Sequence, residues 1–234
     1  MIAVLVPVLK RPHRVEPLVR SFAASCRRDQ ATLLFIVQQG DEKEREALTN
    51  MGAKLDATMP RIGVAVVPND IRSWAKKINV GFRVTNAPWI LCGADDLNFI
   101  PGWVEALVPY MGDVGAGVIG TADLGQVANV QKSCHPLVRR SYVLEHGTID
   151  EPGKVVHEGY DHNFPDTELA LTALSRGAYR FAPECVIEHL HPLTGKAKID
   201  DTYRLGSLLR IEDEELFASR CRLFKLGSYL KVLE

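Results

Sequence analysis

Short apolar runs alternate with longer helical patterns through the first half of this 234-residue chain. Four runs have the length and composition of buried strands, at 2–8, 32–37, 64–67 and 89–92. The stretches between them predict helices, with an apolar stripe at 15–28 and 70–82 and a charged surface at 41–51. Because parallel strands are joined by crossover helices, this alternation predicts an α/β fold. We expect a central, mostly parallel sheet with helices on both faces.

The second half predicts shorter elements and a C-terminal cover. Apolar runs predict strands at 114–121, 137–142, 179–181 and 186–187, and a polar, irregular loop occupies 151–163. Pro165 opens and Gly177 closes a helix over 166–176, and Asp70 is expected to cap the helix over 70–82. Residues 199–226 have helical character. We therefore expect one domain over 1–192, followed by a loop and helical extension over 193–234.

Composition excludes several classes of protein. The formal net charge of −1 excludes a protein whose entire surface attracts polyanions. It is compatible with a local basic cleft. The five cysteines are scattered without a C-x-x-C pair, which indicates a reducing compartment and neither a disulfide frame nor a zinc site. No apolar run reaches the roughly 18 residues of a membrane span. We expect a cytoplasmic protein with no integral membrane segment.

The loop after the fourth predicted strand contains the adjacent acids Asp95 and Asp96. Ligands of open parallel sheets bind outside the carboxyl ends of the strands, which is where this loop lies. Two neighbouring carboxylates repel each other, and a divalent cation would remove that repulsion. The alternative is an Asx turn that ends the strand. Asp41 and Asp70, which follow other strands, are typical of turns and helix caps.

Two histidines follow the last predicted strand, in the sequence Glu188-His189-Leu190-His191. Alternation along an extended chain puts His189 and His191 on one face, so both can approach one ion. Carboxylate and imidazole ligands together suit Mn²⁺ or Mg²⁺ with phosphate completing the shell, or iron or zinc. The alternative for each histidine is a structural role.

Asp166 and Glu168 lie two positions apart in the first turn of the helix at 166–176, so they cannot face the same way. Asp166 shares a face with Leu169 and Ala170, and we expect it to point toward the interior. There it can act as a general base, whereas the alternative is that both acids only complement the helix dipole. Lys77, off the apolar stripe of its helix, is either solvated or placed to meet a diphosphate.

These segments together resemble the family 2 glycosyltransferases, nucleotide-sugar enzymes with the GT-A fold. The resemblance runs from residue 4 to about residue 192 and extends to versions found in actinobacteria and their phages. The segments that carry it are VLVPV (4–8), FIVQQGD (35–41), NVG (79–81), WILCGADD (89–96) with PGW (101–103), PDTEL (165–169) and VIEH (186–189). Two positions depart from the family pattern. Ala94 stands where D-x-D has its first aspartate, and Pro165 stands where a glutamate precedes the base.

The resemblance implies a Rossmann-like GT-A domain that transfers a sugar from a UDP- or GDP-sugar with inversion, using Mn²⁺ or Mg²⁺. Asp96 and His189 would hold the cation, with His191 as a further ligand, and Asp166 would be the catalytic base. Contacts to the nucleotide sugar would come from Pro7, Asp41, Lys77, Asn79 and Asp95.

Two other functions stay open at this point. A nucleotide-sugar-binding module without turnover is favoured by Ala94. A nucleotidyltransferase of similar architecture would normally open with a glycine-rich phosphate loop, and neither residues 9–13 nor any P-loop or G-x-G-x-x-G motif supplies one.

The acceptor hydroxyl could belong to a lipid-linked sugar or other glycan, a protein side chain, a small metabolite or a hydroxymethylated DNA base. A DNA acceptor would need a basic track, and the candidates for it are Lys132, Arg139, Arg140, Lys196, Lys198 and Arg204.

Overall fold

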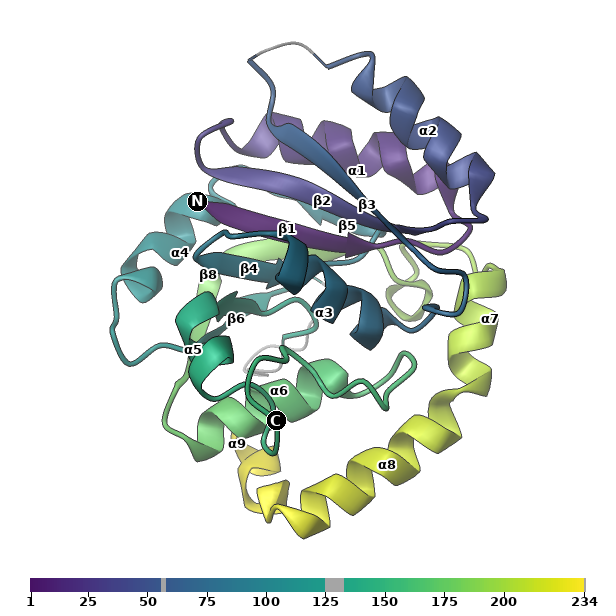
Figure 1. Cartoon of the computed structure of the whole chain (residues 1–234). Coiled ribbons are helices and arrows are strands. Elements are labelled where there is room, and N and C mark those ends of the chain that lie inside the picture. The colour runs from purple at the N-terminus through teal and green to yellow at the C-terminus, as the bar shows by residue number, and fades with distance from the viewer. Residues whose placement is uncertain (56–57, 125–132, 234) are drawn as a thin grey trace.

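A computed structural model describes residues 1–55, 58–124 and 133–233 (Figure 1). Within them, an eight-stranded sheet has the order β3-β2-β1-β4-β7-β6-β8-β5. The strands are β1 (Ile2–Pro7), β2 (Ala31–Gln38), β3 (Arg61–Val67), β4 (Trp89–Cys92), β5 (Leu97–Phe99), β6 (Val118–Ala122), β7 (Leu137–Arg139) and β8 (Tyr179–His189). The first four pair in parallel, as predicted, whereas β7 lies antiparallel between β4 and β6. The fold is therefore α/β with a mixed sheet.

Helices cover both faces of this sheet, which confirms the predicted layering. One hydrophobic cluster joins the sheet to α1 (Pro12–Ser25), α2 (Glu42–Gly52) and α4 (Trp103–Met111). The other joins it to α3 (Trp74–Val84), α5 (Arg140–Glu145) and α6 (Pro165–Ser175). Buried strand β1 serves both clusters because successive side chains alternate: Val4 belongs to the first and Leu5 to the second.

The C-terminal segment forms an arm along one side of the molecule, coloured yellow in Figure 1. It comprises η1 (Pro192–Thr194), α7 (Asp201–Leu208), α8 (Arg210–Leu223), η2 (Leu226–Tyr229) and α9 (Leu230–Leu233). Leu226 and Leu233 are buried in the second cluster, so the end of the arm is anchored beneath α6. None of the helices in the described part of the chain is both long and apolar enough to cross a membrane.

A buried ion network ties α8 to α6. Arg220 donates to both oxygens of Glu168, at 2.8 and 2.9 Å, and makes two further bonds to Asp150. Tyr160 donates to the same Glu168 carboxylate at 2.6 Å. Because Glu168 is 3% exposed, its charge depends on these partners.

Several predicted boundaries are wrong for local reasons. The third helix begins at Trp74 and its cap is Ser73, whose hydroxyl accepts from the Lys76 N–H, so Asp70 does not cap it. The predicted strand at 137–142 ends at Arg139, where α5 begins. The two strands predicted at 179–181 and 186–187 form one strand, β8, with a register shift in its pairing to β6. Strand β5 was not predicted because its three residues lie within the acidic loop region.

Removing Arg220 should leave Glu168 buried without its main cation. We expect Arg220→Met to lower the free energy of unfolding by about 3 to 5 kcal/mol, measured by urea unfolding. Arg222→Met, at an exposed position of the same helix, is the matched control and should change stability by less than about 0.5 kcal/mol. Equal effects of the two substitutions would contradict the assignment.

Candidate active site

A cavity of about 580 Å³ opens at the carboxyl ends of β1 and β4. Strands β2 and β3 lie on the β1 side of this pair in the sheet, and the strands that follow β4 in the chain lie on the β4 side. Open α/β sheets bind ligands at such a point, where the strand order reverses. The predicted site residues that line the cavity are Pro7, Lys77, Asp95, Asp96, Asp166, His189 and His191. The fold therefore brings together acids and imidazoles that are far apart in the sequence.

The acids Asp95 and Asp96 share a cation that belongs to the chain itself, the guanidinium of Arg11. Its Nη1 lies 2.9 Å from Asp95 Oδ1 and 3.3 Å from Asp96 Oδ2. Its Nη2 donates to Asp200 Oδ1 at 2.9 Å, and the guanidinium lies 4.0 Å from the centre of the Tyr203 ring. Arg11 is 4% exposed, so the guanidinium itself has little contact with bulk solvent.

These contacts set the charge of each group. Burial raises the pKa of Asp95 to about 7, and the neighbouring Asp96 adds to the shift while Arg11 opposes it. Burial also acts against the Asp96 carboxylate, but hydrogen bonds from His189 and Tyr203 outweigh it and hold the pKa well below its usual range. Burial disfavours the charged Arg11, yet its acidic partners outweigh this and raise its pKa. Asp96 is therefore the more firmly ionised acid.

His189 ends β8 beside this pair, with Nε2 3.3 Å from Asp96 Oδ1. Burial lowers the pKa of His189, but the Asp96 carboxylate outweighs it and raises the pKa to about 10. The His191 ring lies 5.0 Å from that of His189, centre to centre, so both predicted imidazoles reach the same end of the cavity. Burial and the charge on His189 lower the pKa of His191.

A third imidazole, that of His135, was not predicted. Its ring packs edge-on against His189 with centroids 4.8 Å apart, and its Nδ1 lies 3.1 Å from the Cys92 carbonyl oxygen. Because a carbonyl only accepts, Nδ1 carries the proton and Nε2 is an acceptor. Burial lowers the pKa of His135 to about 4, which keeps the ring neutral. The sequence holds no signal for this residue, since only the β4–β7 pairing brings it to the cavity.

The atoms near Asp96 fit a divalent cation. Asp96 Oδ1 is buried beside the His189 imidazole, whose Nε2 lies 3.3 Å away, while Oδ2 accepts from the Tyr203 hydroxyl at 2.6 Å. One carboxylate oxygen beside one imidazole suits Mn²⁺ or Mg²⁺, which complete their shells with phosphate oxygens and water. The described residues contain no ready-made cluster of three or more His, Cys, Asp or Glu ligands. The protein itself would therefore supply Asp96 and His189 as ligands, with His191 as the further ligand expected from the sequence.

The acid of α6 that points into the interior is Glu168, so the expectation for Asp166 is wrong. Every residue from Thr167 to Ala173 is buried, because α6 is covered by the sheet on one side and the arm on another. An apolar stripe therefore does not identify the inward face of this helix. Asp166 is half-buried and lines the cavity from the first turn of α6.

Lys77 lines the cavity as a buried lysine, so the solvated alternative is wrong. It is 1% exposed, and its Nζ donates to the Val8 carbonyl oxygen at 2.5 Å. Burial lowers the pKa of Lys77 to about 8, against the opposing charges of Asp41 and Asp95.

Two predicted donor contacts do not line the cavity. Asp41 caps α2, where its carboxylate accepts from the backbone N–H groups of Lys10 and Glu44. The Asn79 side chain accepts from the Val155 N–H and donates to the Val156 carbonyl, both at 2.8 Å. Asn79 thereby holds the loop at 151–163. The roles of Asp41 and Asn79 toward a donor stay predictions.

The C-terminal arm supplies part of the cavity wall, although no site residue was predicted there. Tyr203 lies on this arm and lines the cavity. Its neighbour Thr202 donates through its hydroxyl to the Leu9 carbonyl oxygen at 3.0 Å. On α8, Asp213 accepts from three successive backbone N–H groups, those of residues 161–163, which also line the cavity. The sequence pattern of the arm predicted that it is helical, but it did not predict which part of the molecule these helices pack against.

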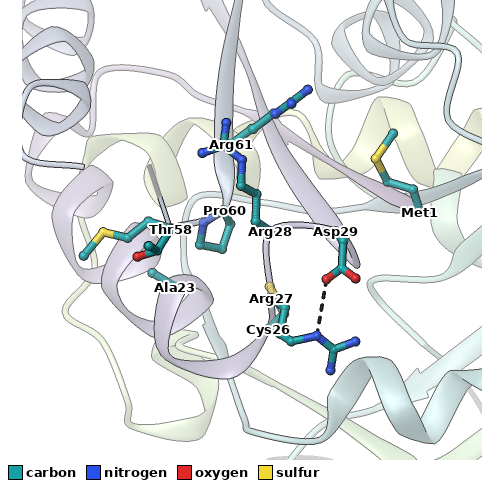
Figure 2. Close-up of a pocket in the computed structure, with 10 residues that line it drawn as sticks. Met1, Ala23, Cys26, Arg27, Arg28, Asp29, Thr58, Pro60 and Arg61 are labelled. Atoms are coloured by element: carbon teal, nitrogen blue, oxygen red, sulfur yellow. Dashed lines mark hydrogen bonds and ion pairs between the residues drawn. The ribbon is translucent and has the colours of Figure 1, made fainter. Parts of the chain in front are cut away.

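A second hollow, of about 880 Å³, lies at the amino ends of the first strands (Figure 2). Met1, Cys26, Asp29 and Arg61 are among its lining residues. None of the predicted catalytic, metal-binding or donor-binding residues lines this hollow.

Comparisons with known proteins found one matching family model and several solved structures of similar fold. The model of the family described as glycosyl transferase family 2 matches residues 3–165. A mannosyltransferase from Pyrobaculum calidifontis, solved with GDP-mannose and Mn²⁺, is similar over 98% of this chain and 69% of its own, with a TM-score of 0.70 and 14% identity. TarS 1-349 from S. aureus, solved with UDP-GlcNAc, is similar over 86% of this chain and 63% of its own, with a TM-score of 0.64 and 10% identity.

A third similar structure is glucosyl-3-phosphoglycerate synthase from Mycobacterium tuberculosis, solved with Mn²⁺, UDP-glucose and phosphoglyceric acid. It is similar over 94% of this chain and 79% of its own, with a TM-score of 0.59 and 13% identity. At such identities the likeness concerns the fold alone. No curated protein matches the chain.

Glu44 of α2 provides a test of the buried charges. It is fully buried and accepts a hydrogen bond from the Arg11 backbone N–H at 2.9 Å. Burial, and then the Asp95 charge, raise its pKa from 4.5 to about 7. A raised pKa in the folded state means that stability is lost as the pH rises through this interval. We expect Glu44→Gln to exceed the wild-type free energy of unfolding by about 1 to 3 kcal/mol at pH 8 and to lose this advantage at pH 5.

Urea unfolding at both pH values measures this difference. Glu42→Gln, which removes an exposed acid of the same helix, should show no such pH dependence. An advantage of Glu44→Gln that grows toward low pH would contradict the prediction.

Proposed function

The chain belongs to glycosyl transferase family 2, and we propose that it transfers a sugar from a UDP- or GDP-sugar to an acceptor hydroxyl with inversion, using Mn²⁺ or Mg²⁺. Its GT-A fold and its glycosyltransferase class agree with the resemblance seen in the sequence. The observation that carries the proposal is that Asp96, His189 and Asp166 line one cavity at the carboxyl ends of β1 and β4.

Each side chain has a role in this proposal. Asp166, which lines the cavity at the start of α6, would take the proton of the acceptor hydroxyl. Asp96 and His189 would hold the cation, and His191 stands beside them as a further ligand. A bound divalent cation would neutralise charge on the departing nucleotide diphosphate. Pro7, Lys77 and Asp95 also line the cavity and would contact the nucleotide sugar.

The β4 loop is held in place for this role by Trp74. Its indole Nε1 donates to the Gly93 carbonyl oxygen at 3.0 Å. Gly93 itself leaves no room for a side chain, because a Cβ there would lie 2.7 Å from the Leu5 carbonyl oxygen. The acids that follow are therefore fixed closely against the end of β1, which favours a preorganised site.

The described arginines give little support to a DNA acceptor. Arg139 and Arg140 donate to backbone carbonyls of neighbouring segments and stack on Trp89 and Phe82, respectively. In the other half of the track, Lys196 pairs with Glu188 and Arg204 with Asp201. Lys132 lies outside the described residues. A hydroxyl on a protein or glycan needs no such track, and the proposal extends to these acceptors.

A binding module without turnover is the second candidate. Ala94 lines the cavity with a methyl group at the position where the family pattern has a carboxylate. Family membership, in turn, argues against a nucleotidyltransferase. Turnover is the property that separates the two remaining candidates.

A screen of nucleotide sugars tests the proposal directly. With Mn²⁺ present, we expect one UDP- or GDP-sugar to raise the melting temperature. Saturation to about 100 times Kd would correspond to roughly 2.7 kcal/mol of added stability. Slow hydrolysis of the same donor, followed as release of the nucleotide, would distinguish an enzyme from a binding module. A protein that binds no nucleotide sugar would contradict both.

The two acids should have separable effects. We expect Asp166→Asn to reduce transfer by about 10² to 10⁴-fold while the Kd of the donor stays close to wild type, because the base acts only on the acceptor. Asp96→Asn should also weaken Mn²⁺-dependent donor binding. Calorimetry and initial rates measure the two effects, and full activity of Asp166→Asn would exclude it as the base.

A further inference from the structure

Arg11 occupies the position at which the Asp95–Asp96 pair needs positive charge. Its guanidinium bonds to both acids and is buried with them. The contact with Asp96 is made at Oδ2, whereas Oδ1 of the same carboxylate lies 3.3 Å from Nε2 of His189, the other predicted metal ligand. One oxygen of this carboxylate thus faces the guanidinium of Arg11, and the other faces an imidazole that could share a cation with it.

We propose that Arg11 is the resident counter-cation of the Asp95–Asp96 pair and that it must leave Asp96 before a divalent cation can bind there. The inference rests on the cation site of the proposed function. Arg11 must leave because a guanidinium and a divalent ion at one buried carboxylate are like charges with little solvent between them, so they repel each other strongly. The shape of arginine suits this role, since its planar fork reaches two or three acids at once, which a lysine ammonium cannot do in the same way.

The C-terminal arm clamps Arg11 in this position. Asp200, which caps α7, binds the second terminal nitrogen of the guanidinium. The Tyr203 ring lies against the guanidinium, and its hydroxyl donates to the same Asp96 Oδ2 that Arg11 contacts. Departure of Arg11 from Asp96 therefore disturbs the contacts that hold the first turn of α7. Cation binding and the position of α7 are consequently linked.

Mn²⁺ alone, without any nucleotide, is the probe for this linkage. Loss of the free Mn²⁺ signal in electron paramagnetic resonance gives its Kd. We expect Arg11→Met to bind Mn²⁺ about tenfold more tightly than wild type, and Tyr203→Phe, which keeps the stacked ring, to bind it about threefold more tightly. Arg20→Met removes an exposed arginine from α1 and should bind Mn²⁺ as wild type does. Unchanged melting curves identify the variants that are folded.

The rate of amide hydrogen exchange in α7 is a second readout. If Arg11 had only a structural role, Mn²⁺ would not change this rate. In wild type, Mn²⁺ should speed exchange of the amides at 203–208 at least severalfold. In Arg11→Met these amides should exchange fast already, with no further response to Mn²⁺.

Either readout alone is able to overturn the proposal. It fails if folded Arg11→Met and Tyr203→Phe bind Mn²⁺ no more tightly than wild type, or if exchange in α7 is indifferent to Mn²⁺. Failure of the proposed function is a different result. In that case no nucleotide sugar is bound or hydrolysed, while Mn²⁺ affinity still responds to Arg11.

Discussion

Two adjacent carboxylates buried at the end of β4 require positive charge beside them, and the arrangement of distant segments supplies it. A buried carboxylate without a partner would take up a proton instead of remaining charged. Arg11 comes from the loop after β1, His189 from the end of β8 and Tyr203 from the arm. The charge cluster therefore depends on the sheet order, on the length of β8 and on the docking of α7. In turn it holds these three segments together at the mouth of the cavity.

The arm is part of the active-site architecture as much as of the fold. Asp213 fixes the turn at 161–163, immediately before the α6 helix that carries Asp166. Arg220 holds Glu168 one half-turn further along the same helix. Both contacts join α8 to the segment that carries Asp166, the base in the proposed function. Residues on both sides of the domain boundary predicted at residue 192 thus line one cavity. The boundary itself stays a prediction from the sequence.

The first four strands and the helices between them were predictable because each is a local pattern of adequate length. Boundaries failed where two local signals compete. Asp70 and Ser73 are both good helix caps, and only Ser73 stands three residues before a free N–H of α3. Residues 137–142 are apolar enough for a strand, but the chain turns into α5 at Arg140 to cover the sheet.

For the site, residue types and order predicted Asp96, His189, His191 and Asp166, which indeed share one cavity. Sequence alone could not identify Arg11 or His135, since neither belongs to a recognisable pattern. It also could not tell Asp166 from Glu168, because α6 is buried on more than one side.

Local hydrophobic periodicity and a short series of polar motifs determined the class of fold, the family and the acids and imidazoles available for chemistry. Only the tertiary structure decided which of these groups are charged, which are already paired and which face the cavity. The reason is that burial and Coulomb interactions depend on distances between segments such as Arg11, Asp96 and Tyr203, and such distances exist only once the sheet and the arm have packed.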